Sequence, residues 1–369
     1  MLAARAYIKQ PILLAFEVSL AEYLQKINIK PAALLGHSLG EFTALVVSKV
    51  LSFKDAARLV LKRSELMSKT PFGKMLSVIC EREALKTIIP DNLDIAAWNT
   101  SNLVTVSGAC DAIDDFVIKC NKLEIITQPL PTKHAFHSRL LDSILDEFRL
   151  ELQKVEFKKP LIPIVSNLDG KLLSYERLSD VNYWLQQMRY PVEFIACVTF
   201  LKNNYNPIFM EVGPGVTLKT LTDRILFSDK KRQVINTLPH PKDKIDAMQV
   251  IQQNIGVLWE NGHNIDWSKI SSQTGLCKRI PIPVYSFELK KCWVNSNEKL
   301  VNHKISNKPG AYHSFWKQKS KTGTKISLDD YKIIVTNDHN LDFKSYDNFE
   351  LKQASNEEEI NALILGLQN

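Results

Sequence analysis

The stretch LLGHSLGEFTAL, residues 34–45, places Ser38 between two glycines, directly after an apolar run and directly before a segment with helical periodicity. A serine hydroxyl is a weak nucleophile, so it needs a base within hydrogen-bond reach and a backbone that exposes its oxygen. A sharp turn from a strand into a helix gives that exposure, and the helix dipole favours a developing oxyanion nearby. Ser38 is therefore our candidate nucleophile for acyl chemistry.

The Gly-x-Ser-x-Gly pattern is not specific by itself, because it arises by chance in about one chain in eight of this length. The alternative is that Ser38 is a turn residue that caps a helix beginning near Leu39. The position of the motif between a predicted strand and a predicted helix favours the nucleophile.

Eight histidines are candidates for the missing base. His37 adjoins the serine, but adjacent residues on a strained turn point apart, so we interpret His37 as structural. His134 and His137 lie in PTKHAFHSRLLDS, where the chain returns from one predicted subdomain to the other, and clefts between subdomains commonly hold sites. His137 is the candidate base, and the alternative is a histidine whose hydrogen bonds are satisfied without any role in catalysis.

Two patterns of elements position these residues. Residues 74–130 read as strand, helix, strand, strand, helix, strand, which is the ferredoxin-like order. Residues 1–73 and 131–240 alternate helices with short apolar strands, which predicts an α/β layered subdomain with a mainly parallel sheet. We therefore predict a large, hydrolase-like α/β subdomain with a small ferredoxin-like subdomain inserted into it.

Local chemistry predicts two helix starts and leaves the C-terminal part undefined. Pro11 suits the first turn of a helix, and Ser52 is a candidate cap for the helix that follows it. Residues 241–295 have the composition of a linker. Residues 296–369 are rich in Asn, Lys and Ser, contain too few periodic segments to specify a fold, and are in part a candidate for disorder.

The composition excludes several classes of function. Of 369 residues, 45% are hydrophobic and 24% charged, as in an ordinary globular protein. The net charge of +7 is scattered along the chain, which argues against nucleic acid and suits an anionic substrate or an acidic partner. No metal-ligand spacing occurs, and the six dispersed cysteines indicate reduced thiols. No run approaches the roughly 18 apolar residues that span a membrane, so we expect a cytoplasmic protein.

Several motifs together resemble the acyltransferase domains of modular polyketide synthases, which are related to malonyl-CoA:acyl carrier protein transacylases. GHSLGE matches the nucleophile motif at Ser38, RLVLKRSELM places Arg63 at the family's spacing of 25 residues after the serine, and HAFHS places the base at His137. Later matches are YWLQQMRYPVEF, EVGPG at 211–215, LWENGHNIDW at 258–267 and IPIPVYSFELKKCW at 280–293. The resemblance covers residues 1 to about 295, and the last motif resembles a post-acyltransferase linker.

The resemblance implies a mechanism and a substrate. Ser38 would take a malonyl group from malonyl-CoA, and a phosphopantetheine thiol on an acyl carrier protein would remove it, with His137 moving the proton and Arg63 holding the free carboxylate. No bound cofactor or metal is implied, and the partners would be the carrier protein and neighbouring synthase domains such as a ketosynthase. The resemblance places four further residues around the substrate: His37, Leu39, Phe136 and Gln187. The HAFH sequence and Leu39 indicate malonyl rather than methylmalonyl, because Phe136 would fill the space of an α-methyl group.

The chain departs from the family pattern at its start. Family members normally carry a glycine-rich segment before the nucleophile, and that segment contributes a first strand and an oxyanion-hole amide. Because only 37 residues precede Ser38, we expect an N-terminally truncated domain without that donor, which puts its activity in question.

Two other functions remain open from the sequence. A serine esterase or acylhydrolase would need an acidic triad member between the serine and the histidine, and Asp114 and Asp115 are poor candidates. The other alternative is a scaffold module that keeps the fold without the activity.

Overall fold

The computed structural model describes residues 8–229, 233–240, 242–274, 281–286, 333–336 and 351–354. The chain divides into two units, Met1–Ile282 and Pro283–Asn369. In the second unit, β9 (Ile333–Thr336) and β10 (Leu351–Ala354) form a parallel pair. The remainder of the predicted tail, including EEEINALILGL, lies outside the described residues. None of the helices in the described ranges is long and apolar enough to cross a membrane.

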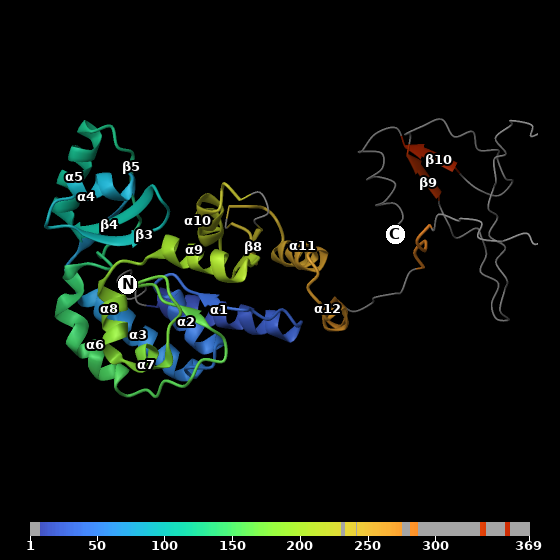
Figure 1. Ribbon diagram of the computed structural model, residues 1–369, viewed down its shortest axis with the longest axis horizontal. Helices are drawn as coiled ribbons and strands as arrows, with labels where there is room; N and C mark the ends of the chain where they lie inside the picture. The colour runs from blue at the N-terminus through green and yellow to red at the C-terminus, as the bar shows by residue number, and fades with distance from the viewer. Residues whose placement is uncertain are drawn as a thin grey trace, which may run out of the picture. The chain divides into compact units, whose positions relative to one another are not determined.

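The large subdomain of the first unit combines helices with short parallel strands (Figure 1). Its elements are α1 (Lys9–Lys26), β1 (Leu34–Leu35), α2 (Gly40–Val47), α3 (Phe53–Lys69), the 3-10 helix η2 (Arg139–Ile144), α6 (Leu145–Leu152), β6 (Ile164–Val165), α7 (Tyr175–Ser179), α8 (Val181–Arg189), α9 (Phe194–Tyr205), β7 (Phe209–Glu211), α10 (Thr217–Ile225), β8 (Val234–Asn236), α11 (Ala247–Glu260) and α12 (Trp267–Thr274). The parallel pairing that we predicted is present as two separate pairs, β1 with β6 and β7 with β8.

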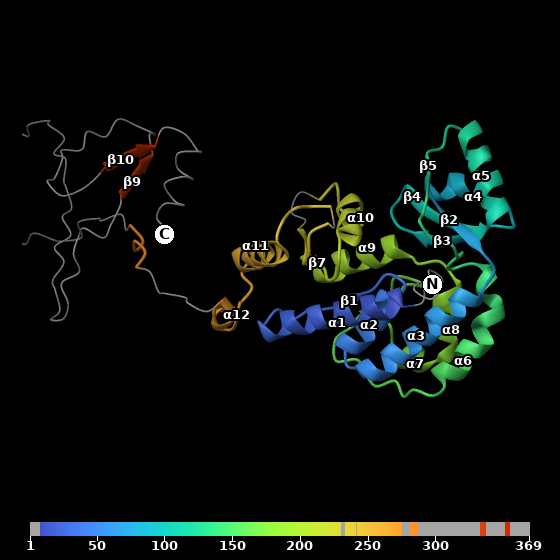
Figure 2. The same ribbon diagram turned by 180° about the vertical axis from the view of Figure 1, so that it is seen from behind.

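Helices α1, α2, α3, α6 and α8 lie together in the large subdomain (Figure 2). Their buried apolar side chains form the main core, which includes Phe42, Phe148 and Trp184. Both helix starts follow the sequence prediction: Pro11 lies in the first turn of α1, and the Ser52 side chain accepts the Asp55 N–H at 3.0 Å. This cap satisfies one of the amides that the first turn of a helix leaves without a partner.

The small subdomain has the predicted ferredoxin-like order of elements. These are β2 (Gly73–Ile79), α4 (Arg82–Ile88), β3 (Asp94–Trp98), β4 (Leu103–Ala109), α5 (Cys110–Lys122) and β5 (Thr127–Pro129). They form an antiparallel sheet in the order β3-β4-β2-β5. The strand at its edge, β3, also pairs with the large subdomain, because Trp98 N–H donates to Val192 O at 2.8 Å and Val192 N–H donates to Ala96 O at 2.9 Å. The two subdomains therefore share a backbone contact at β3.

The segment that we expected to be a linker contains regular structure. Helix α11 buries Ile251, Ile255 and Leu258 in a cluster with Leu24 of α1 and Ile27, which directly follows that helix. The composition of residues 241–295 did not indicate this helix, although its buried face carries apolar residues at helical spacing.

Candidate active site

Ser38 lies in a tight turn between β1 and α2 and has a backbone φ of 52°. A non-glycine residue seldom adopts this left-handed conformation, which costs about 1–3 kcal/mol unless its surroundings impose it. A Cβ on Gly36 would lie 2.0 Å from the carbonyl carbon of Gly40, so only glycine fits there, whereas a Cβ on Gly40 would meet open space. Only the first glycine of the motif is therefore required by sterics.

Side chains from two distant elements hold this turn. Asn167, just after β6, accepts the Ser38 N–H at 2.7 Å and donates to Gly36 O at 2.5 Å. Gln187 of α8 donates from Nε2 to Ser38 O at 2.7 Å. With Glu41, these residues form what we call the turn network.

Glu41 is completely buried at the back of this network. Its Oε1 accepts the Asn167 N–H at 3.0 Å and the Tyr183 hydroxyl at 2.8 Å, while its Oε2 has no partner among the described residues. Burial raises the pKa of Glu41 to about 7, because the charged form loses its hydration. Near neutral pH the network therefore holds this carboxyl partly in its protonated form.

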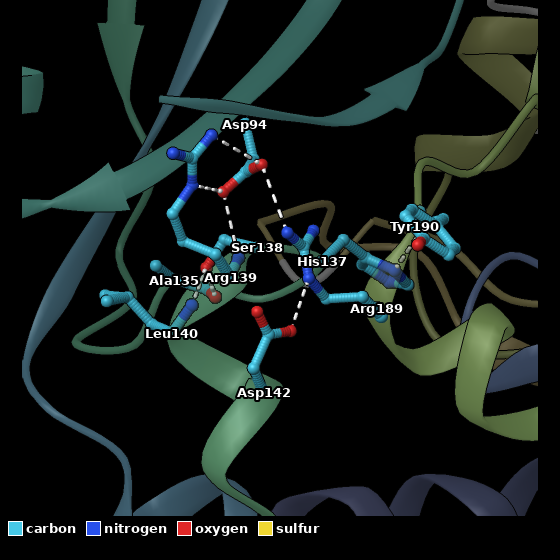
Figure 3. A network of polar contacts seen from close by, with 9 residues as sticks. All are labelled: Asp94, Ala135, His137, Ser138, Arg139, Leu140, Asp142, Arg189 and Tyr190. Carbon is cyan, nitrogen blue, oxygen red and sulfur yellow. Dashed lines mark hydrogen bonds and ion pairs between the residues drawn. The ribbon is translucent and has the colours of Figure 1, made fainter. Parts of the chain in front are cut away.

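The hydroxyl of Ser38 and the imidazole of His137 are in direct contact. His137 Nε2 lies 2.7 Å from Ser38 Oγ, and Nδ1 lies 2.9 Å from the Tyr190 carbonyl oxygen (Figure 3 shows the second contact). Since a carbonyl only accepts, Nδ1 carries the proton and the Nε2 lone pair faces the serine. Burial and the nearby charges of Arg63 and His37 lower the pKa of His137 to about 3, so the imidazole is neutral at pH 7 and able to accept a proton.

Arg63, on the buried face of α3, reaches the same hydroxyl. Its Nη2 donates to Ser38 Oγ at 3.0 Å, and its Nη1 donates to the Gln10 side-chain oxygen. The residue is only 2% exposed, its Nε has no acceptor, and no carboxylate among the described residues forms an ion pair with it. Burial lowers the pKa of Arg63 to about 10, which still leaves it charged at pH 7. The site therefore contains a buried cation beside the nucleophile, an arrangement that can bind an anion.

The remaining residues of the sequence prediction lie nearby in different settings. Leu39 belongs to the main core, and Gln187 contacts the backbone of Ser38 rather than its hydroxyl. His37 bonds to the Asn99 side chain at 3.0 Å and packs on the Phe194 ring, which accords with a structural role. Phe136 is half-buried and stacks on His134. Roles for His37, Leu39, Phe136 and Gln187 in binding the substrate stay predictions.

Sequence reasoning missed three residues that complete the arrangement: Gln10, Asn167 and Tyr190. Asn167 lies two residues after β6, and carboxyl ends of parallel strands are where site residues gather, so its position in the fold is the signal that points to it. Gln10 precedes Pro11 without any motif of its own. Tyr190 contributes only a carbonyl oxygen, which every residue has, so no pattern of side chains could point to it.

An acidic triad member is absent from the described contacts of His137, because the Tyr190 carbonyl accepts its Nδ1–H instead. Asp114 forms an exposed ion pair with Lys74 on the small subdomain, and Asp115 is exposed on the same helix. The two candidates that an esterase reading required do not reach His137.

Comparison with known proteins identifies the family. Residues 4–262 match the family described as "Acyl transferase domain". The chain belongs to this family. A phenolphthiocerol synthesis polyketide synthase of Mycobacterium marinum is 32% identical over 290 residues, which are 77% of this chain and 13% of that protein. This chain thus spans a small part of the length of that relative.

Solved structures show the same fold. The acyl transferase domain of ZmaA is 33% identical, with a TM-score of 0.69, over 76% of this chain and 65% of that one. An acyl carrier protein S-malonyltransferase from Vibrio cholerae is 29% identical, with a TM-score of 0.58, over 63% of this chain and 78% of that one. The predicted fold, an α/β subdomain with an inserted ferredoxin-like subdomain, is therefore confirmed for this acyl transferase domain.

Proposed function

We propose that this domain transfers a malonyl group from malonyl-CoA, through an ester on Ser38, to the phosphopantetheine thiol of an acyl carrier protein. The observation that carries the proposal is Arg63, a buried cation 3.0 Å from the nucleophile and without a carboxylate partner among the described residues. A malonyl thioester ends in a free carboxylate, which a guanidinium binds through two parallel hydrogen bonds. Names of relatives that include a polyketide synthase and a malonyltransferase support the same reaction.

The first step forms the acyl-serine. His137 Nε2 takes the hydroxyl proton while Ser38 Oγ attacks the thioester carbonyl, and the proton then passes to the departing CoA thiolate. The Ser38 amide is occupied by Asn167, but the Leu39 amide has no acceptor among the described residues and lies at the start of α2, where the helix dipole favours an oxyanion.

The second step returns the enzyme to its starting state. The carrier thiol gives its proton to His137 Nε2 and attacks the ester, and Ser38 Oγ leaves and takes that proton back. The chemistry requires no bound cofactor or metal. We place the reaction in the cytoplasm, in a polyketide or fatty-acid-like synthase where domains such as a ketosynthase use the loaded carrier.

Intact mass spectrometry tests this proposal. The chain is incubated separately with malonyl-CoA, methylmalonyl-CoA and acetyl-CoA, with Ser38→Ala as the control, and an acyl carrier protein is then added. We expect a malonyl adduct that Ser38→Ala lacks, that forms faster than the methylmalonyl adduct, and that moves to the carrier thiol. Arg63→Lys should slow malonylation at least about tenfold and leave acetylation nearly unchanged, because only the malonyl group carries a carboxylate.

Other outcomes would contradict the proposal. Loss of the adduct to water, with none on the carrier, would identify an acylhydrolase. No adduct on a folded chain would identify a scaffold module.

A further inference from the structure

A group of four charged side chains lies beside the loop that carries His137 (Figure 3). Asp94 begins β3 of the small subdomain, Arg139 and Asp142 belong to η2, and Arg189 ends α8. Asp94 Oδ2 accepts Arg139 Nε at 2.9 Å, Arg189 Nη2 lies 3.5 Å from Asp94 Oδ1, and Arg189 Nε donates to Asp142 Oδ1 at 2.6 Å. We call this group the Asp94 clamp.

The clamp holds the chain just after His137. Asp94 Oδ2 also accepts the backbone N–H of Arg139 at 2.8 Å, two residues beyond the histidine. His137 has a φ of 56°, a conformation that a non-glycine residue keeps only when its neighbours impose it. The Ser138 hydroxyl assists by donating to Ala135 O at 2.6 Å. Asp94 and Ser138 thus maintain the strained turn from which the imidazole projects.

The clamp also holds the hydrogen-bond acceptor of His137. Arg189, which Asp94 and Asp142 bind, is the residue before Tyr190, and the Tyr190 carbonyl accepts the proton on Nδ1. Two residues further on, Val192 pairs with the backbone of β3. The segment 189–192 is therefore fastened to the small subdomain on both sides of this carbonyl.

Asp94 is well suited to this role because its charge is retained. Its side chain is 13% exposed. Burial alone would raise the pKa of Asp94, but hydrogen bonds from Arg139 and the charges of Arg189 and Arg139 outweigh burial and lower it. The carboxylate is therefore ionised at neutral pH and binds both guanidinium groups by charge-assisted hydrogen bonds.

We propose that Asp94 is a positioning residue for His137, which it orients from the small subdomain through Arg139 and Arg189 without touching a reacting atom. The proposal rests on the proposed function only in that His137 activates Ser38. A displacement of about 1 Å in a catalytic group can cost about a hundredfold in rate, so a loosened clamp should slow activation of the serine.

The test measures how fast a fluorophosphonate labels Ser38 in the full chain. Ser38 Oγ bonds to phosphorus, the P–F bond breaks with departure of fluoride, and the hydroxyl proton goes to His137 Nε2. Intact mass over time gives a rate constant and a final labelled fraction, and no acyl-CoA is needed. Asp94→Asn should lower the rate constant about tenfold or more with the final fraction unchanged, whereas Asp114→Asn, at an exposed ion pair of the same subdomain, should change neither.

The His137→Ala background distinguishes positioning from a general structural role. There, Asp94→Asn should slow labelling no further, because the residue through which it acts is gone. An equal loss in both backgrounds, or a wild-type rate constant for Asp94→Asn, would overturn the proposal.

A second variant covers the case in which Asp94→Asn folds poorly and the labelled fraction falls. Arg189→Gln leaves the contacts between Asp94 and Arg139 in place and should lower the rate constant severalfold. An unchanged rate constant for this variant would also overturn the proposal. Labelling of the wild type by the fluorophosphonate but not by malonyl-CoA would contradict the proposed function and leave the test of Asp94 intact.

Discussion

Ser38 and His137 both have a backbone in the left-handed region, with φ of 52° and 56°, but the chain holds them there by different means. The Ser38 turn is held by Asn167, Gln187 and Glu41, all buried within the large subdomain. The His137 turn is held by ion pairs that cross to the small subdomain and are partly exposed, since the Arg139 side chain is 47% exposed.

This difference means that the two turns depend on different parts of the fold. The candidate nucleophile is held chiefly by buried groups of the large subdomain, whose interactions water screens little, and Asn99 of the small subdomain also bonds to the neighbouring His37. The base depends on how the small subdomain is attached, because its supports begin on β3. We therefore expect Ser38 and His137 to respond differently to mutation, pH and salt.

The largest effect should come from removing the base itself. His137→Ala should lower the rate of Ser38 acylation by about 10³-fold, since general-base catalysis contributes roughly 10²–10⁴-fold. Stopped-flow or quenched mass spectrometry with malonyl-CoA measures this rate, and the thermal melting temperature serves as the control for folding. A loss below tenfold would show that another group takes the proton.

Breaking the turn network should affect stability and activity together. Asn167→Ala removes the acceptor for Ser38 N–H and the donor to Gly36 O inside the core, so we expect a loss of about 2–4 kcal/mol in the free energy of unfolding. The acylation rate should also fall about tenfold or more, because the serine loses its imposed conformation. Urea unfolding followed by tryptophan fluorescence measures the first effect; Asn182→Ala, at an exposed position of α8, is the matched control.

The turn network should also respond to pH through Glu41. Because burial raises the folded-state pKa of Glu41 from 4.5 to about 7, the folded state binds more protons than the unfolded state between these values. Stability is therefore greatest below pH 4.5 as far as Glu41 is concerned, and it falls as pH rises toward 7. Glu41→Gln should remove a decrease on the order of 2 kcal/mol between pH 5 and pH 8.

Burial also raises the pKa of Glu17 to about 7, so Glu17 adds a further decrease in stability as pH rises. The measurement is therefore the difference between wild type and Glu41→Gln in urea unfolding at each pH. An identical pH dependence of stability in both proteins would show that Glu41 does not cause the decrease.

The smallest effect should come from salt. Raising NaCl from 0.1 to 0.5 M shortens the screening length, which weakens exposed ion pairs more than buried hydrogen bonds. The fluorophosphonate rate constant should therefore fall by about twofold or less in the wild type and not at all in Asp94→Asn. Equal salt effects on both proteins would mean that the ion pairs of Asp94 do not make the His137 turn sensitive to salt.

The order of elements in the small subdomain, and two helix starts in the large one, were predictable because they depend on local signals. The ferredoxin-like order follows from alternating apolar segments, and the starts of α1 and α3 follow from Pro11 and Ser52. Helix α11 was not recognised, because its burial against α1 depends on residues more than 200 positions earlier in the chain. The two separate parallel pairs also could not be predicted, since the register between distant strands leaves no periodic trace in the sequence.

By itself, the sequence determined which groups we propose for the chemistry. Ser38, Arg63 and His137 stand in short motifs whose residue types suit the proposed reaction. Only the tertiary structure decided how these groups are held: Asn167 lies 129 residues from Ser38, and Tyr190 lies 53 residues from His137. The physical reason is that a hydrogen bond requires two atoms to lie within about 3 Å, and local periodicity constrains only residues within a few turns of one another. The support of the base by Asp94 has the same origin, because the folded chain alone brings β3 beside η2 and the end of α8.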